Sequence, residues 1–187
     1  MSDGESRVFR AERSGRLESG FRRWTQNPRR ILKPFVKEGM TVVDMGCGPG
    51  FFTLPMAGMV GAAGRVIAVD LQEEMLRKLR GRIEGTDLGD RVTLKRCKAG
   101  SIGVPGPVDF VLLFYVVHEV PSPEELLRET ASILVPGGRA LLVEPDFRVT
   151  RQEFGKTVET AKGAGLTVSR GPWILFSRSA VLERTSG

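Results

Sequence analysis

The sequence contains few of the residues that cross-link small proteins or bind metals. Its 187 residues include two cysteines, Cys47 and Cys97, and one histidine, His118. The cysteines form no CxxC pair, so the sequence offers neither a disulfide framework nor a zinc site, and we expect no bound metal. We interpret both cysteines as small, partly buried fillers rather than as redox or nucleophilic groups.

Long apolar runs are also missing. No segment approaches the ~20 consecutive apolar residues that a membrane-spanning helix needs. The N-terminal sequence MSDGESRVFR has no apolar core of a secretory signal. We therefore expect a cytoplasmic protein without a transmembrane segment. Hydrophobic residues make up 41% of the chain, which is enough for one compact domain.

Positive charge is concentrated near the N-terminus. Residues 1–33 contain nine arginines and lysines against four acidic residues, and thus carry five of the six net positive charges. Such a segment can contact nucleic acid, an acidic substrate or an anionic membrane surface, or it can simply be solvated. We divide the chain into a basic arm with a short helix, residues 1–36, and a main domain, residues 37–187.

Short apolar segments alternate with helical patterns along the main domain. The expected strands are TVVDM (41–45), RVIAVD (65–70), RVTLKR (91–96), VDFVLLFY (108–115) and RALLVEP (139–145). The expected helices span residues 52–60, 73–83, 123–134 and 152–164, with a short one from 27 toward 36. Strands rich in Val, Ile and Leu that alternate with helices indicate a parallel sheet covered on both faces. The predicted fold class is α/β and doubly wound.

The last part of the chain has a different pattern. LTVSRGPWILF and SAVLER both read as strands, and no helix separates them. Two strands so close in sequence can pair only in antiparallel fashion, because a parallel return needs a dozen or more residues. We therefore predict an antiparallel strand near the C-terminus of a mostly parallel sheet.

The first expected strand leads into the glycine-rich turn GCGPGF. Gly46, Gly48 and Gly50 have the spacing GxGxG, which lets the backbone adopt positive φ angles and approach a ligand closely. A dinucleotide fingerprint, GxGxxG, would need its last glycine at position 51. That position is Phe51, which argues against NAD or FAD.

Two acidic residues close the first two expected strands. Asp70 can accept hydrogen bonds from both hydroxyls of a ribose, as the acidic residue does in nucleotide-binding sheets. Asp44 suits a ligand with cationic groups, such as the ammonium and sulfonium of S-adenosylmethionine (SAM). The alternatives are that Asp44 only caps the turn and that Asp70 is the N-cap of the helix beginning near Glu73.

These motifs resemble those of the class I SAM-dependent methyltransferases. VVDMGCGPGFF is similar to the first SAM-binding motif of that family, and AVD resembles the second. Residues 108–145 resemble the segment from the fourth to the fifth strand in the branch with ubiquinone and menaquinone C-methyltransferases and arsenite methyltransferases. The resemblance implies a Rossmann-like, mostly parallel seven-stranded sheet, with SAM as cofactor and S-adenosylhomocysteine as product. The arsenite enzymes need several cysteines, so an arsenic substrate is not expected.

The resemblance also implies which residues hold the cofactor. Residues expected around its methionine end are Asp44, Gly46, Cys47 and Gly48. Asp70 is expected to hold the ribose, and Leu71 to pack on adenine. Residues that complete the expected cofactor site are Gly50, Phe51 and Phe114.

The adenine end departs from the family pattern. An acidic residue after the third strand commonly holds the adenine amino group in this family. Here the sequence reads KAGSIGVP, with Gly100 in that position. We expect backbone atoms around Gly100 and Ser101 to replace it.

Two residues are candidates for catalysis. His118 follows the fourth strand and matches the first histidine of an LHH-like motif in the family. It is either a general base, a group that orients the substrate, or a side chain that packs beside the SAM sulfur. Glu144, at the end of the fifth strand, either contacts a cationic or hydroxylated substrate or forms a loop cap or ion pair. Trp173 and Phe176 either belong to the core or line an apolar substrate.

The sequence thus predicts a SAM-dependent methyltransferase that acts on a small or lipophilic molecule. No domain is inserted between the strands, so we expect the N-terminal segment to form part of a substrate lid. The site is then open or completed by a second copy in a homodimer. An RNA or protein methyltransferase guided by the basic arm is an alternative that the absence of NPPY-like and PC motifs disfavours. A SAM-binding regulatory module without turnover is another alternative.

Overall fold

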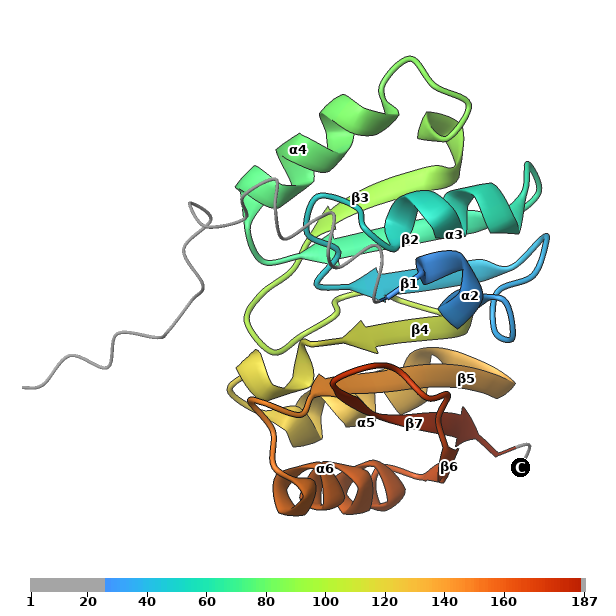
Figure 1. Ribbon diagram of the computed structural model, residues 1–187. Helices are drawn as coiled ribbons and strands as arrows, with labels where there is room; N and C mark the ends of the chain where they lie inside the picture. The colour runs from blue at the N-terminus through green and yellow to red at the C-terminus, as the bar shows by residue number, and fades with distance from the viewer. Residues whose placement is uncertain (1–25, 186–187) are drawn as a thin grey trace, which may run out of the picture.

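A computed structural model describes residues 26–185 and shows a central seven-stranded sheet with helices on both faces (Figure 1). The strands are β1 Thr41–Met45, β2 Arg65–Asp70, β3 Val92–Arg96, β4 Val108–Phe114, β5 Leu134–Pro145, β6 Leu166–Arg170 and β7 Ser177–Arg184. The α-helices are α2 Pro28–Leu32, α3 Thr53–Val60, α4 Glu73–Ile83, α5 Pro123–Ile133 and α6 Arg151–Gly163. Short 3-10 turns, η2 Gly89–Arg91 and η3 Val117–Glu119, precede β3 and follow β4. The predicted arm lies, up to residue 25, outside the described residues.

The strand order is β3-β2-β1-β4-β5-β7-β6. Neighbouring strands from β3 through β5 pair in parallel, whereas β7 pairs in antiparallel fashion with both β5 and β6. This arrangement confirms the predicted Rossmann-like α/β fold and its antiparallel strand. The chain order reverses between β1 and β4, and open parallel sheets bind ligands outside the carboxyl ends of the strands at such a point. We call this side of the sheet the carboxyl edge.

The sheet separates two hydrophobic cores. On one face, side chains of α2, α3 and α4 pack against alternate residues of the strands, including Phe110 and Leu112. On the other face, α5 and α6 cover the intervening residues, including Val111 and Leu113. The central strands are buried on both faces, which explains why they are continuous apolar runs rather than alternating ones. At the carboxyl edge, the buried residues include the acidic side chains Asp44, Asp70 and Glu144, each at or next to the end of its strand.

Local sequence explains most helix boundaries. Asn27 caps α2 by accepting a hydrogen bond from the Arg30 amide, at 3.2 Å, as the Asn-Pro pair predicts. Thr150 and Glu153 form a reciprocal capping box at the start of α6. The helix α2 ends at Leu32, short of the predicted Val36, because the proline that follows Lys33 has no amide hydrogen to continue the helix.

Strand β5 differs from the prediction. It begins at Leu134 rather than Arg139 and includes the VPGG segment, which the sequence pattern places between a helix and a strand. The register shifts here, because β4 advances from Val108 to Phe110 while β5 advances from Leu134 to Arg139. The extra residues form a bulge that the glycines permit. Among residues 26–185, no helix has the length and apolar character to cross a membrane.

Candidate functional site

The glycine turn after β1 is fixed to β2 by backbone hydrogen bonds. The amides of Gly46 and Cys47 both donate to the Val69 carbonyl oxygen, at 2.8 and 3.0 Å. Gly46 and Gly48 have φ angles of +71° and +53°, which side-chain-bearing residues rarely adopt. Among residues 26–185, a Cβ atom placed on Gly48 would meet no heavy atom within 4 Å, so the described part of the chain leaves the surface in front of this turn open.

Gly50 has a different role in the same turn. Its φ angle is +95°, and a Cβ atom here would lie 2.5 Å from Cδ1 of Leu79. Leu79 belongs to α4 and is fully buried. Gly50 therefore permits close packing of the turn on α4, whereas Gly48 faces open space.

Asp70 links the turn to the segment after β2. Its buried carboxylate accepts hydrogen bonds from the amides of Gly48 and Gln72, both at 2.8 Å. Desolvation raises the pKa of Asp70, and these backbone hydrogen bonds oppose the rise. Each carboxylate oxygen can still accept another hydrogen bond. The N-cap of α4 is Gln72, so the interpretation of Asp70 as that N-cap is wrong.

Asp44 lies beneath the turn. Its carboxylate accepts a hydrogen bond of 2.6 Å from the Thr53 hydroxyl at the start of α3, and both side chains are buried. This contact agrees with the capping alternative, because Asp44 joins β1 to the helix that follows the turn. The two acidic residues therefore differ: Asp44 bonds to α3, the helix after the turn, whereas Asp70 bonds to Gly48 within the turn.

The loop after β3 is positioned by a residue that sequence reasoning missed. Glu129 on α5 accepts hydrogen bonds from the amides of Ile102 and Gly103, at 2.8 and 2.6 Å, and from the Ser101 hydroxyl at 3.4 Å. Gly100, at the start of this segment, has a φ angle of +79°. No local motif marks Glu129, since it lies more than 25 residues from the loop in sequence.

Both cysteines are buried, as the sequence predicts. Desolvation raises the pKa of Cys47, and the nearby carboxylates of Asp44 and Asp70 add to the rise. Desolvation likewise raises the pKa of Cys97. Neither thiol is therefore activated as a thiolate nucleophile.

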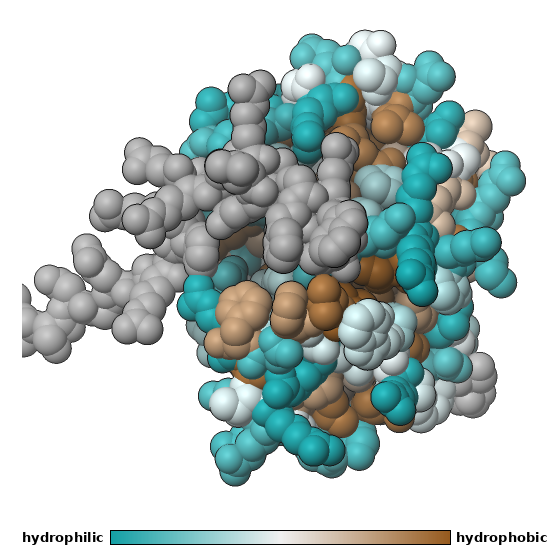
Figure 2. All heavy atoms as spheres, in the orientation of Figure 1, coloured by the Kyte–Doolittle hydropathy of each residue, from teal (hydrophilic) through white to brown (hydrophobic). Residues whose placement is uncertain are grey.

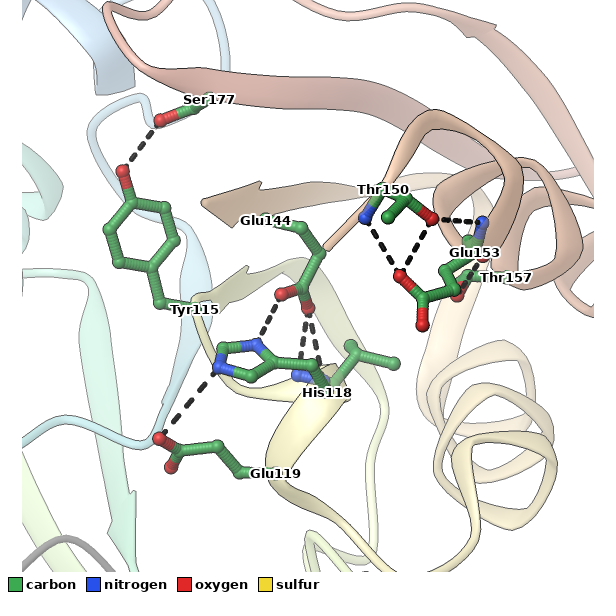
Figure 3. Close-up of polar contacts among 9 residues, drawn as sticks. Tyr115, His118, Glu119, Glu144, Thr150, Glu153, Thr157 and Ser177 are labelled. Atoms are coloured by element: carbon green, nitrogen blue, oxygen red, sulfur yellow. Dashed lines mark hydrogen bonds and ion pairs between the residues drawn. The ribbon is translucent and has the colours of Figure 1, made fainter. Parts of the chain in front are cut away.

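His118 and Glu144, predicted separately, lie in direct contact (Figure 3). Glu144 ends β5 with its side chain buried, and one carboxylate oxygen accepts the amides of Val117 and His118 at 3.0 and 3.3 Å. Its other oxygen bonds to Nδ1 of the His118 ring. This hydrogen bond raises the pKa of His118, and desolvation partly opposes the rise. Glu144 thereby fixes both the turn and the ring of His118.

The second ring nitrogen of His118 faces away from Glu144. Nε2 lies 3.9 Å from a carboxylate oxygen of Glu119, and the His118 side chain is 20% exposed. Burial raises the pKa of Glu119. Figure 3 shows the imidazole ring between the two glutamates, with Glu144 inside and Glu119 toward the surface. A histidine held in this way can accept or donate a proton at Nε2.

Tyr115, the residue after β4, bonds to two segments far away in the chain, and Figure 3 shows one of these contacts, with Ser177. Its hydroxyl lies 2.6 Å from the Ser177 hydroxyl at the start of β7 and accepts a hydrogen bond of 2.7 Å from the Gln26 amide. The Tyr115 backbone has a φ angle of +61°, unusual for an aromatic residue. In the sequence, Tyr115 is only the last residue of the expected strand 108–115.

The remaining predicted aromatic residues fall into two groups. Phe114 is buried, and its ring lies 4.4 Å from that of Phe52, which in turn contacts Phe51 at 5.0 Å between centroids. Trp173 and Phe176 are exposed, so their interpretation as core residues is wrong. The buried aliphatic side chain of Ile174 takes that core position between them.

The β1–β2 side of the carboxyl edge fits an adenosine-type ligand with a charged tail. The open surface at Gly48 leaves room for the ligand chain, and the free acceptor positions of Asp70 suit ribose hydroxyls. Leu71, next in sequence, exposes its side chain and offers an apolar surface to a base. SAM is a ligand of this kind.

Comparisons with known proteins agree with this arrangement. The family model of the methyltransferase domain matches residues 42–138. A ubiquinone/menaquinone biosynthesis C-methyltransferase from an Enterobacter species is 30% identical over 110 residues, which are 58% of this chain and 44% of that protein. The chain spans less than half the length of the curated relatives that it matches.

Solved structures extend the likeness to most of the chain. A SAM-dependent methyltransferase from Aquifex aeolicus superposes with a TM-score of 0.76 at 29% identity, covering 89% of this chain and 94% of that one. A SAM-dependent O-methyltransferase from Thermotoga maritima shares the fold, with a TM-score of 0.68 at 20% identity over 87% of this chain and 66% of its own. The chain therefore belongs to the class I SAM-dependent methyltransferases, and SAM is its cofactor.

Proposed function

We propose that this enzyme methylates a small or lipophilic acceptor and that His118, positioned by Glu144, removes the acceptor proton. The observation that carries the proposal is the contact between His118 Nδ1 and the buried carboxylate of Glu144. A buried carboxylate is costly unless it is hydrogen-bonded, and here three donors from one short turn satisfy it. The main interactions of this buried acidic residue are therefore with the turn and the ring of a single histidine.

The hydrogen bond also sets the tautomer of His118. A carboxylate can only accept, so Nδ1 carries the hydrogen and Nε2 of the neutral ring has a free lone pair. Nε2 is on the partly exposed side of the ring. The raised pKa makes the imidazole a stronger base, which helps proton removal from an amine, hydroxyl or carbon acceptor.

Residues of the β1–β2 side would hold the cofactor. We assign the ribose to Asp70, the adenine to Leu71 with the backbone of Gly100 and Ser101, and the methionine end to the glycine turn. Bound SAM supplies an electrophilic methyl group on a sulfonium. The difficulty of this displacement is mostly alignment and exclusion of water, which a rigid edge such as this one can supply.

The acceptor class follows from two observations. The chain resembles curated ubiquinone/menaquinone C-methyltransferases, whose named pathway makes lipophilic quinones. In addition, exposed aromatic side chains stand on the loops beyond β5 and before β7, next to the strand that carries Glu144. Both favour an apolar acceptor over a highly charged one.

Transfer of a labelled methyl group tests the proposal. Full-length protein with tritiated-methyl SAM would be incubated with lipid, RNA and protein fractions of a cell extract. We expect label in the lipid or small-molecule fraction, and we expect the His118→Asn variant to lose about 10²–10⁴-fold in rate while still binding S-adenosylhomocysteine. Label in RNA or protein would instead support an enzyme guided by the basic arm. An unaffected His118→Asn variant would contradict the role of His118.

A further inference from the structure

Three exposed aromatic side chains lie on two loops at the carboxyl edge. Phe147, Trp173 and Phe176 are 74%, 82% and 56% exposed. All three lie on the loops that follow β5 and precede β7. Figure 2 shows hydrophobic side chains at the surface among hydrophilic ones on the side where the parallel strands of Figure 1 end. We call these three residues the aromatic edge.

The two loops of the aromatic edge are joined to each other. The Asp146 amide donates to the Phe176 carbonyl oxygen at 3.0 Å. Phe147 occupies a tight turn closed by the Arg148 amide and the Pro145 carbonyl at 3.1 Å. Phe147 and Phe176 are therefore displayed from hydrogen-bonded turns, and Trp173 lies in the irregular segment that precedes the second of them.

The backbone of Phe176 supports a role for this display. Its φ angle is +56°, in the left-handed region where glycine or asparagine is usual. Backbone strain of this kind persists where the surrounding structure imposes it, and it concentrates at functional sites. A large apolar side chain in such a turn, facing solvent, gains nothing for the core.

Two exposed arginines lie a few residues from the aromatic edge in the chain, and one exposed acidic residue, Asp146, precedes Phe147. Arg170 ends β6, and Arg151 begins α6; both are exposed, and neither forms an ion pair within 4 Å among residues 26–185. On the outer surface of α5, by contrast, Arg128 pairs with Glu124 at 2.6 Å. Arg151 also stands at a helix N-terminus, where the helix dipole disfavours a cation unless an anion is near.

We propose that the aromatic edge docks on the surface of an anionic lipid bilayer. Exposed Trp and Phe side chains beside arginines match the interface of such a bilayer, where aromatic rings lie at headgroup level and cations contact phosphates. A protein partner fits less well, because a stable protein interface buries about 800 Å² on each partner, drawn from about 20–30 residues, and the aromatic edge consists of three. The proposal concerns attachment only and does not depend on which acceptor is methylated.

Vesicle co-sedimentation of the full chain tests the proposal. We expect binding to phosphatidylcholine vesicles that contain phosphatidylglycerol, and weaker binding to phosphatidylcholine alone. The Trp173→Ser and Phe147→Ser variants should each lower the partition coefficient about tenfold, because each removes an aromatic side chain that would be buried in the bilayer on binding. Neutralising Arg170 as Arg170→Gln should lower it about fivefold on anionic vesicles. The matched control Arg128→Gln should leave binding unchanged.

Fluorescence gives a second, independent readout. The sequence has two tryptophans, so a Trp24→Phe background leaves Trp173 as the reporter. Its emission should shift to shorter wavelength when anionic vesicles are added. Absence of both co-sedimentation and this shift, or binding that Trp173→Ser leaves unchanged, would overturn the proposal. The proposal would also be overturned if the protein self-associates without lipid and Trp173→Ser abolishes that self-association. The aromatic edge would then bind a second copy of the chain.

Discussion

The two sides of the carboxyl edge are held together in different ways. On the β1–β2 side, the two acidic residues of the turn bond to partners 9 and 22 positions away, as in Thr53–Asp44 and Gly48–Asp70, and only the loop after β3 is held from farther along the chain, by Glu129. On the β4–β5–β7 side, they link residues 26, 62 and 89 positions apart, as in the bonds of Glu144 and Tyr115. The contacts of the glycine turn thus lie mostly within β1, α3 and the adjacent β2, which we call the proposed cofactor side. The ends of β4, β5 and β7, the proposed acceptor side, depend on contacts between distant segments.

The largest effect is expected from Glu144→Gln on the acceptor side. The amide can still accept the backbone hydrogen bonds, but its NH₂ group would donate to Nδ1 and leave the hydrogen on Nε2. By analogy with catalytic triads, the wrong tautomer should lower kcat by about 10²–10⁴-fold. Affinity for SAM should change little, because within residues 26–185 Glu144 bonds to Val117 and His118 and not to the glycine turn or Asp70.

The same variant gives a pH test. In the wild type, kcat should rise with pH and level off above the raised pKa of His118, because only the neutral ring is a base. Without the carboxylate, the pKa should fall toward its ordinary value, and the midpoint of the residual activity should move to lower pH. An unchanged midpoint would mean that another group limits the rate.

A smaller effect is expected from Asp70→Asn on the cofactor side. Loss of charge-assisted hydrogen bonds to the ribose is worth about 1.5–3 kcal/mol, so the Kd for S-adenosylhomocysteine should rise roughly 10–150-fold. Isothermal titration calorimetry measures this change, with the exposed Asp87→Asn variant as control. At saturating SAM, kcat should stay within a few-fold of the wild type. A large loss of kcat with unchanged Kd would contradict the division between the two sides.

The smallest effect is expected on stability. Thr53→Val removes the buried donor to Asp44 with little change of shape and should lower the free energy of unfolding by about 1–3 kcal/mol. Ser177→Ala removes the partner of the half-buried Tyr115 hydroxyl and should cost only about 0.5–1.5 kcal/mol. Denaturant titrations compare the two variants. An equal or larger loss in Ser177→Ala would show that the acceptor side is as tightly ordered as the cofactor side.

This difference explains how far the sequence could predict the site. The strands and helices were placed closely because apolar runs and caps are local signals: β1, β2 and α4 match the predicted bounds. The turn glycines and Asp70 were likewise recognised from adjacent residues. The roles of individual cofactor residues, and those of His118 and Glu144 in catalysis, stay predictions.

What the sequence could not supply were contacts between distant segments. It marks His118 and Glu144 as separate candidates, but only the register of β4 against β5 brings them together. Nothing near Glu129 indicates that it holds the loop after β3. The exposure of Trp173 was also hidden, since an apolar side chain in a strand-like run reads as core.

The insertion of β7 between β5 and β6 has a consequence for biosynthesis. Among the described strands, β6 pairs only with β7, which follows it in the chain. A nascent chain that has reached only Arg170 therefore has β6 without a hydrogen-bonding partner and the outer edge of β5 open. Unpaired strand edges invite association with other chains. We expect a ribosome that stalls within the β6–β7 loop to display a chain in which β1–β5 can already pair but the outer edge of β5 stays unpaired. Such a chain should bind chaperones until β7 is made and pairs with β5.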